Sequence, residues 1–167
     1  DRRGLWLRPR GRPRLIFRRR AAKLRRFPST PRLRVPYPVS SKRRPLVAGN
    51  WKMNGTRAMA AALARDIAAE AWPDALEVLV CPPAAYLDVV GGAIAGATVA
   101  LGGQDCSEHA PGAYTGETAA AMLADCGCRY VIVGHSERRQ FFGDTDARVA
   151  AKVVAAQAAG LTPILCV

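Results

Sequence analysis

Polar side chains follow apolar runs at three places in this sequence, and two of them hold residues suited to catalysis. Asn50 and Lys52 follow the first run, and His135 follows the run at residues 130–133. A lysine at a strand end is a point charge suited to a phosphate or an oxyanion. Because Ser136 is a favoured helix N-cap residue, His135 should lie at the positive end of a helix, which disfavours an imidazolium. We therefore predict an anion-binding site in which a neutral imidazole donates a hydrogen bond to a carbonyl.

Plainer interpretations of the same residues stay open. A single lysine in a loop is often only solvated, and a histidine after a strand is packed for structural reasons about as often as it is catalytic. Gln104 and Asp105 also follow an apolar run. His109 lies in a loop with glycine and proline, where we expect it to be solvated.

Apolar runs alternate with alanine-rich stretches from residue 45 to residue 167. The expected strands begin near residues 45, 77, 98, 129 and 162, and the expected helices cover 56–71, 84–95, 118–125 and 145–159. Strands that are apolar throughout are typical of a parallel sheet covered by helices. An open doubly wound sheet and a (β/α)₈ barrel both fit this α/β pattern. Residues 50–55 lack the G-x-G-x-x-G spacing of a dinucleotide-binding turn.

Capping residues set some of the expected helix ends. Thr56 is a suitable N-cap for the first helix, and Gly160 suits the left-handed position that follows the last one. Met59, Leu63 and Ile67 recur at every fourth residue, which predicts that they form the buried face of the first helix.

The formal net charge of +12 is divided very unevenly along the chain. Residues 1–44 hold 17 of the 25 basic residues and a single acid, so residues 45–167 are net acidic at −4. Recurring prolines and like charges predict that residues 1–44 are disordered, separate from a globular domain at 45–167. Three interpretations of this segment stay open: non-native sequence, an organelle transit peptide, or an arm that binds nucleic acid or an anionic membrane. A nucleic-acid-binding protein is therefore the competing class of function.

Five scattered cysteines, an odd number, indicate reduced thiols rather than a disulfide framework. The spacing of Cys126 and Cys128 is tighter than in zinc sites, and no second Cys or His pair follows, so we predict no metal site. No apolar run reaches the ~18 residues that a transmembrane helix needs, so we predict no membrane span.

Two long motifs resemble the triosephosphate isomerase family. They are A-G-N-W-K-M-N-G at residues 48–55 and V-I-V-G-H-S-E-R-R at residues 131–139. Residues 113–117 and 161–167 resemble two further landmarks of the family, in the same order and at similar distances. The resemblance covers residues 45–167 and none of residues 1–44.

The resemblance implies a (β/α)₈ TIM barrel that interconverts dihydroxyacetone phosphate and glyceraldehyde 3-phosphate through an enediolate. It implies that His135 polarises the substrate carbonyl, that Lys52 offsets the charge of the phosphate and the enediolate, and that Asn50 contacts substrate oxygens. Glu137 is implied to pair with Lys52 or to assist proton movement, and Ser136 to support the loop of His135. No cofactor or metal ion is implied, because an aldose–ketose proton transfer needs only acid, base and charge stabilisation.

The general base of the family is a glutamate after the sixth strand, in a Y-E-P-x-W-type segment that these 167 residues do not contain. A complete barrel needs ~250 residues. We interpret residues 45–167 as the first half of a barrel, truncated in its fifth strand, and predict that this chain is inactive by itself.

For the full-length protein, the resemblance implies a phosphorylated triose substrate and a homodimer. The loop at 105–117, with Thr115 and Gly116 near its tip, is implied to contact the neighbouring subunit. Residues 45–167 are predicted to bind neither nucleic acid nor membrane. The expected location is the cytoplasm, or an organelle if residues 1–44 are a transit peptide.

Overall fold

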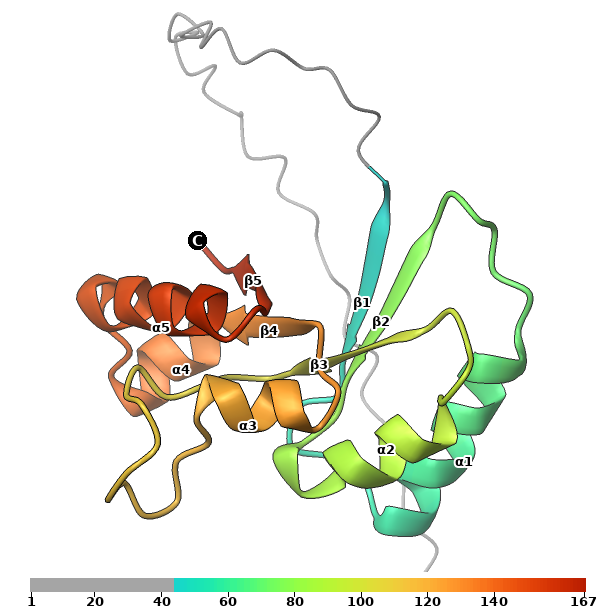
Figure 1. The fold of residues 1–167 in the computed structure, drawn as a ribbon, viewed down its shortest axis with the longest axis horizontal. Helices are drawn as coiled ribbons and strands as arrows, with labels where there is room; N and C mark the ends of the chain where they lie inside the picture. The colour runs from blue at the N-terminus through green and yellow to red at the C-terminus, as the bar shows by residue number, and fades with distance from the viewer. Residues whose placement is uncertain (1–43) are drawn as a thin grey trace, which may run out of the picture. The chain divides into compact units, whose positions relative to one another are not determined.

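Five parallel strands form one sheet in which the spatial order follows the chain (Figure 1). This computed structural model describes residues 44–167, so the expectations for the basic segment before Arg44 lie outside the described residues. The strands are β1 (Leu46–Asn50), β2 (Glu77–Cys81), β3 (Ala100–Gly103), β4 (Tyr130–Val133) and β5 (Thr162–Leu165).

The order β1-β2-β3-β4-β5 decides between the two folds that the apolar pattern left open. A doubly wound sheet reverses its strand order at a switch point, whereas a barrel adds each new strand beside the preceding one. The sheet also curves across its width (Figure 1). The prediction of a truncated (β/α)₈ barrel is therefore confirmed.

The connecting helices begin and end near the expected capping residues. They are α1 (Arg57–Ala69), the 3₁₀ turn η1 (Ala84–Tyr86), α2 (Leu87–Ala93), α3 (Ala120–Asp125), α4 (Ser136–Phe142) and α5 (Asp146–Ala158). The Thr56 hydroxyl accepts a hydrogen bond from the backbone N–H of Met59 at 3.2 Å, as expected of an N-cap. Gly160 follows α5 with a φ of 76°, which confirms its left-handed position.

The predicted buried face of α1 is partly wrong. Ala60 and Ala64 are fully buried, whereas Met59 is 40% exposed and Leu63 and Ile67 are half-buried. The methyl side chains of Ala60 and Ala64 pack into the same cluster as Val78 and Val80 of β2, because small residues let a helix lie close to a sheet. The large residues at every fourth position therefore lie at the edge of the buried face, and the alanines beside them form its centre.

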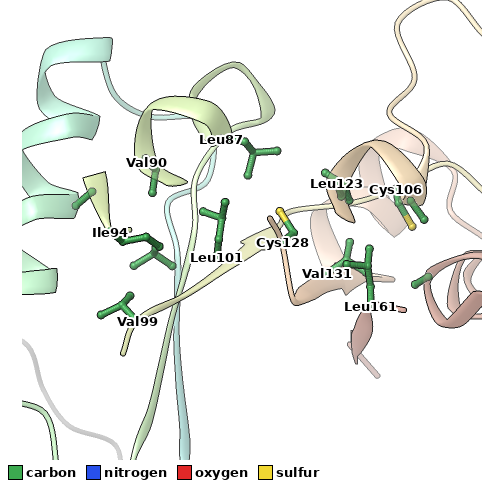
Figure 2. Packing of buried hydrophobic residues seen from close by; sticks show 14 of the residues in the cluster. Leu87, Val90, Ile94, Val99, Leu101, Cys106, Leu123, Cys128, Val131 and Leu161 are labelled. Atoms are coloured by element: carbon green, nitrogen blue, oxygen red, sulfur yellow. The ribbon is translucent and has the colours of Figure 1, made fainter. Parts of the chain in front are cut away.

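Apolar side chains pack on both faces of the sheet. Alternate residues of β2 point in opposite directions, so Val78 and Val80 join the cluster beneath the helices while Leu79 and Cys81 join a smaller cluster on the other face. Figure 2 shows the larger cluster, where Leu87 and Val90 of α2 lie near Leu101 of β3, and Leu123 of α3 lies near Val131 of β4. Two-sided burial explains why β2, β3 and β4 read as continuous apolar runs, whereas the edge strands β1 and β5 are more exposed.

The five cysteines are free thiols, and three of them are buried. Burial raises the pKa of Cys81 and of Cys128 to about 12, and that of Cys106 to about 11. Cys126 is exposed. Within the part of the chain that the structure describes, no helix is long and apolar enough to cross a membrane.

Candidate active site

The curved sheet brings together the residues that follow β1 and β4. The Lys52 ammonium lies 2.9 Å from Nε2 of His135 and 2.9 Å from Oε1 of Glu137, side chains that are 83 and 85 positions away in the sequence. Asn50 is the last residue of β1, and His135 follows β4 after a single glycine. The carboxyl ends of parallel strands therefore meet at one site, as the positions of these residues after apolar runs had suggested.

Lys52 has a left-handed backbone with a φ of 56°, the only positive φ of a non-glycine residue among residues 44–167. This conformation costs about 1–3 kcal/mol and persists only where the surroundings impose it. The Asn50 side-chain oxygen accepts a hydrogen bond from the backbone N–H of Lys52 at 3.0 Å. In this structure the side chain of Asn50 therefore helps to hold the backbone of Lys52 in its left-handed conformation.

His135 itself is the N-cap of α4, so the expectation that Ser136 fills this position is wrong. His135 has an extended ψ of 141°, and its Nδ1 accepts a hydrogen bond from the backbone N–H of Glu137 at 3.2 Å. Ser136 is the first helical residue and is exposed. An imidazole nitrogen can serve as the capping acceptor in place of a hydroxyl, which residue preferences for N-caps do not reveal.

Gly134 sets the direction in which the chain enters α4. Its φ is 69°, and a Cβ atom at this position would lie 2.8 Å from Cγ1 of Val149 in α5. Glycine alone avoids both the left-handed strain and the clash. The turn between β4 and His135 can therefore pass close against α5.

The capping bond decides which nitrogen of a neutral His135 carries the proton. Since Nδ1 accepts the N–H of Glu137, a neutral ring that keeps this capping bond holds its proton on Nε2. Nε2 then cannot accept from the Lys52 ammonium, which lies 2.9 Å away and is itself only a donor. The two donors do not bond to each other, and both are left for an outside acceptor. A carbonyl or anionic oxygen that enters between them can accept from both, which is the arrangement that stabilises a developing oxyanion.

Glu137 holds the Lys52 ammonium at the site. The hydrogen bond from Lys52 keeps the pKa of Glu137 below its usual range. Both side chains are partly exposed, so this ion pair orients Lys52 more than it stabilises the fold.

These residues line a cleft of about 250 Å³. Its walls are formed by Asn50, Lys52, Met53, Gln104, Asp105, His135, Glu137, Arg138 and Phe142. Two carboxylates reach it, and both are engaged: Glu137 by Lys52, and Asp105 by Arg138 and Lys152. Thr115 and Gly116 are exposed in the loop after β3 and do not line the cleft.

A buried ion cluster beneath the cleft was missed in the sequence. Lys152 is fully buried, and its ammonium lies 2.9 Å from Asp105 and 2.8 Å from Asp144. Arg138 joins the same two carboxylates at 2.7 and 3.2 Å. The signal was a charged residue on the apolar face of α5, because Val149, Lys152 and Ala156 follow one another at helical spacing.

Among the described residues, no group of three or more His, Cys, Asp or Glu side chains is placed to hold a metal ion. Figure 1 and the contacts above define a barrel-type α/β protein with donors for an oxygen at the carboxyl ends of its strands. The family model of triosephosphate isomerase matches residues 45–167. The chain belongs to the triosephosphate isomerase family.

Curated relatives support the assignment. The triosephosphate isomerase of Thiobacillus denitrificans is 58% identical over 125 residues, which cover 75% of this chain and 50% of the relative. That of Shewanella sp. (strain ANA-3) is 53% identical over 132 residues, covering 75% of this chain and 51% of the relative. The chain thus spans about half the length of the curated relatives it matches.

Proposed function

We propose that this chain carries the oxygen-binding half of a triosephosphate isomerase site. The reaction would interconvert dihydroxyacetone phosphate and glyceraldehyde 3-phosphate by proton transfer through an enediolate. The observation that carries the proposal is the convergence of the Lys52 ammonium and Nε2 of His135.

In this proposal the two donors serve the oxygen on which charge develops. His135 donates from Nε2 to the substrate carbonyl, and the charge of Lys52 offsets the phosphate and the enediolate. Asn50 contacts substrate oxygens besides holding the backbone of Lys52. A donor that is positioned in advance at a developing oxyanion contributes on the order of 10²–10³ in rate.

The proton transfer also needs a carboxylate base. Glu137 and Asp105, the carboxylates that line the cleft, are both bound to cations, and neither is free to accept a proton from carbon. We therefore expect no measurable turnover from the 167-residue chain by itself, since a general base contributes on the order of 10²–10⁴ in rate.

We further propose a homodimer in which the loop with Thr115 and Gly116 contacts the partner. Residues 111–117 of this loop are all exposed, including the aromatic ring of Tyr114. Free thiols are typical of a reducing compartment, which supports a cytoplasmic location. The net acidic charge of residues 45–167 gives no reason to expect nucleic-acid binding by this part.

A hybrid protein tests the proposal. In it, the whole chain is followed by the second half of the Thiobacillus denitrificans relative, beginning where the match to this chain ends. The hybrid protein should interconvert the two triose phosphates, and Lys52→Met should lower kcat/KM by about 100- to 1,000-fold.

The matched control is Arg65→Met, which removes an exposed cation from α1 and should leave kcat/KM unchanged. A folded hybrid protein without activity would contradict the proposed function. So would a Lys52→Met variant as active as the Arg65→Met control.

A further inference from the structure

The left-handed backbone of Lys52 is held at its carbonyl as well as at its N–H. The side-chain amide of Gln104, after β3, donates a hydrogen bond to the carbonyl oxygen of Lys52 at 2.9 Å. Asn50 accepts from the N–H of the same residue. Both backbone polar groups of the strained residue are therefore bound by side chains, one from the end of β1 and one from the residue that follows β3.

The amide of Gln104 also joins a third strand. Its nitrogen donates to the carbonyl oxygen of Cys81, the last residue of β2, at 2.8 Å. That oxygen also accepts the backbone N–H of Trp51 at 3.1 Å. One half-buried amide thus connects the ends of β1, β2 and β3, using both of its N–H groups.

Asp105, the next residue, reaches toward the other side of the cleft. Its carboxylate lies 2.7 Å from Nε of Arg138 in α4 and 2.9 Å from the ammonium of the buried Lys152. Since α4 begins at the capping residue His135, this ion pair ties the helix that carries His135 and Glu137 to the end of β3.

We propose that Gln104 and Asp105 are positioning residues that set the distance between Lys52 and His135. Gln104 fixes the backbone from which the ammonium extends, and Asp105 fixes the helix from which the imidazole extends. Neither residue needs to touch a ligand for this role. The catalytic meaning of the inference rests on the proposed function, but the geometry can be tested without activity.

The chemistry of the contacts limits which residues could replace Gln104. A glutamate would bring a carboxylate against two carbonyl oxygens, which are acceptors and have no proton to give. Methionine has a similar length without the two N–H groups. Gln104→Met therefore removes the hydrogen bonds while it keeps most of the volume, and Gln157→Met makes the same change on the exposed face of α5.

The experiment is proton NMR on the isotopically labelled 167-residue chain. A left-handed residue gives a strong contact between its own amide and α protons, so this signal reports the backbone of Lys52. A contact between the ε protons of Lys52 and the ring of His135 reports the distance across the cleft. The chain has two histidines, and His109→Gln assigns their ring signals.

We expect both signals in the unmodified chain and in Gln157→Met, and the loss of both in Gln104→Met. Arg138→Gln tests how α4 is held, because it removes the contacts of Arg138 with both Asp105 and Asp144 and leaves the ion pairs of buried Lys152 in place. It should keep the backbone signal of Lys52 and lose the contact with His135.

The inference is overturned if Gln104→Met keeps both signals, if Arg138→Gln keeps the contact across the cleft, or if the unmodified chain shows neither. In the hybrid protein, Gln104→Met should lower kcat/KM by about 100-fold, since a displacement of about 1 Å costs that much. An inactive unmodified hybrid protein would count against the proposed function alone, because the NMR result would still decide the positioning role.

Discussion

Two residues beside the cleft, Lys52 and Gly134, have left-handed backbones. The two residues accommodate this conformation in different ways. Gly134 has no side chain to clash, although a Cβ there would meet Val149. Lys52 bears the strain and is held by the side chains of Asn50 and Gln104. Strain is therefore borne only on the Lys52 side of the cleft, where the surrounding side chains offset it.

Replacement of Gly134 by alanine should destabilise the chain. The added methyl group strains a φ of 69° and presses on Val149, which should lower the free energy of unfolding by about 2 kcal/mol. Urea unfolding followed by circular dichroism measures the effect. Gly92→Ala in α2 is the control, because a Cβ there meets nothing within 4 Å, and it should be neutral or stabilising.

An equal loss of stability in the two variants would show that the turn before His135 does not require glycine at position 134.

At the scale of residues, the sequence predicts those site residues that directly follow an apolar strand. Lys52 and His135 could be selected because an apolar run precedes each of them. Helical spacing places Lys152 on the apolar face of α5, but the local pattern does not connect it to its partners Asp105 and Asp144, so the ion cluster could not be predicted. The prediction of the α4 cap was wrong because serine is the commoner N-cap residue, whereas here the imidazole of His135 accepts the capping hydrogen bond.

At the scale of elements, the loop after β3 is fastened to α5 by an ion pair. Arg148 in the first turn of α5 contacts Glu108 with two nitrogens, at 2.8 and 3.3 Å. This hydrogen bonding lowers the pKa of Glu108 from 4.5 to about 2. The pair therefore favours the folded state wherever Glu108 is ionised.

The contribution of this pair should disappear in acid. Because the pKa of Glu108 is lower in the folded chain, its contribution is complete above pH 4.5 and is lost as the pH falls toward 2. Glu108→Gln should lower the free energy of unfolding by about 1 kcal/mol at neutral pH, a discounted value because Arg148 is 40% exposed. Urea titrations of both chains at several pH values measure the difference.

Arg148→Gln in each background isolates the pair as a double-mutant cycle. A difference between the wild-type chain and Glu108→Gln that stays the same from neutral pH to pH 2.5 would contradict the assignment.

Strands were easier to predict than helices. The expected strand at 130–133 matches β4, and the second expected strand begins with β2, because chains buried on both faces are apolar without interruption. The expected helix at 84–95 divides into η1 and the shorter α2. A long helix is disfavoured here by the prolines before it, Pro82 and Pro83, and by the glycines within and after it. The spacing of apolar residues does not reveal this effect.

At the scale of the whole molecule, apolar runs alone did not separate a barrel from an open sheet. Both folds bury parallel strands beneath helices, and the difference lies in which strands are neighbours. The barrel was predicted from the resemblance of residues 48–55 and 131–139 to the triosephosphate isomerase family, and the strand order confirms it.

The proposed dimer predicts the effect of a charge at the tip of the loop after β3. In the hybrid protein, Thr115→Glu should bury an unpaired carboxylate in the interface, which is costly. Sedimentation velocity should show monomers at concentrations where the unmodified hybrid protein is dimeric. Thr98→Glu, an exposed threonine before β3, is the control and should leave the dimer intact.

A Thr115→Glu protein that stays dimeric and fully active on dilution would place the interface elsewhere.

The agreement between strand order and chain order has a consequence for synthesis on the ribosome. Paired residues in β1 and β2, such as Leu46 and Glu77, are about 30 positions apart, so each strand finds its neighbour in the unit made just before it. At roughly 5–20 residues per second, each strand and its helix have about 1 to 6 seconds before the next strand emerges. The nascent sheet can grow at one edge, and a stalled ribosome would hold a correctly paired intermediate.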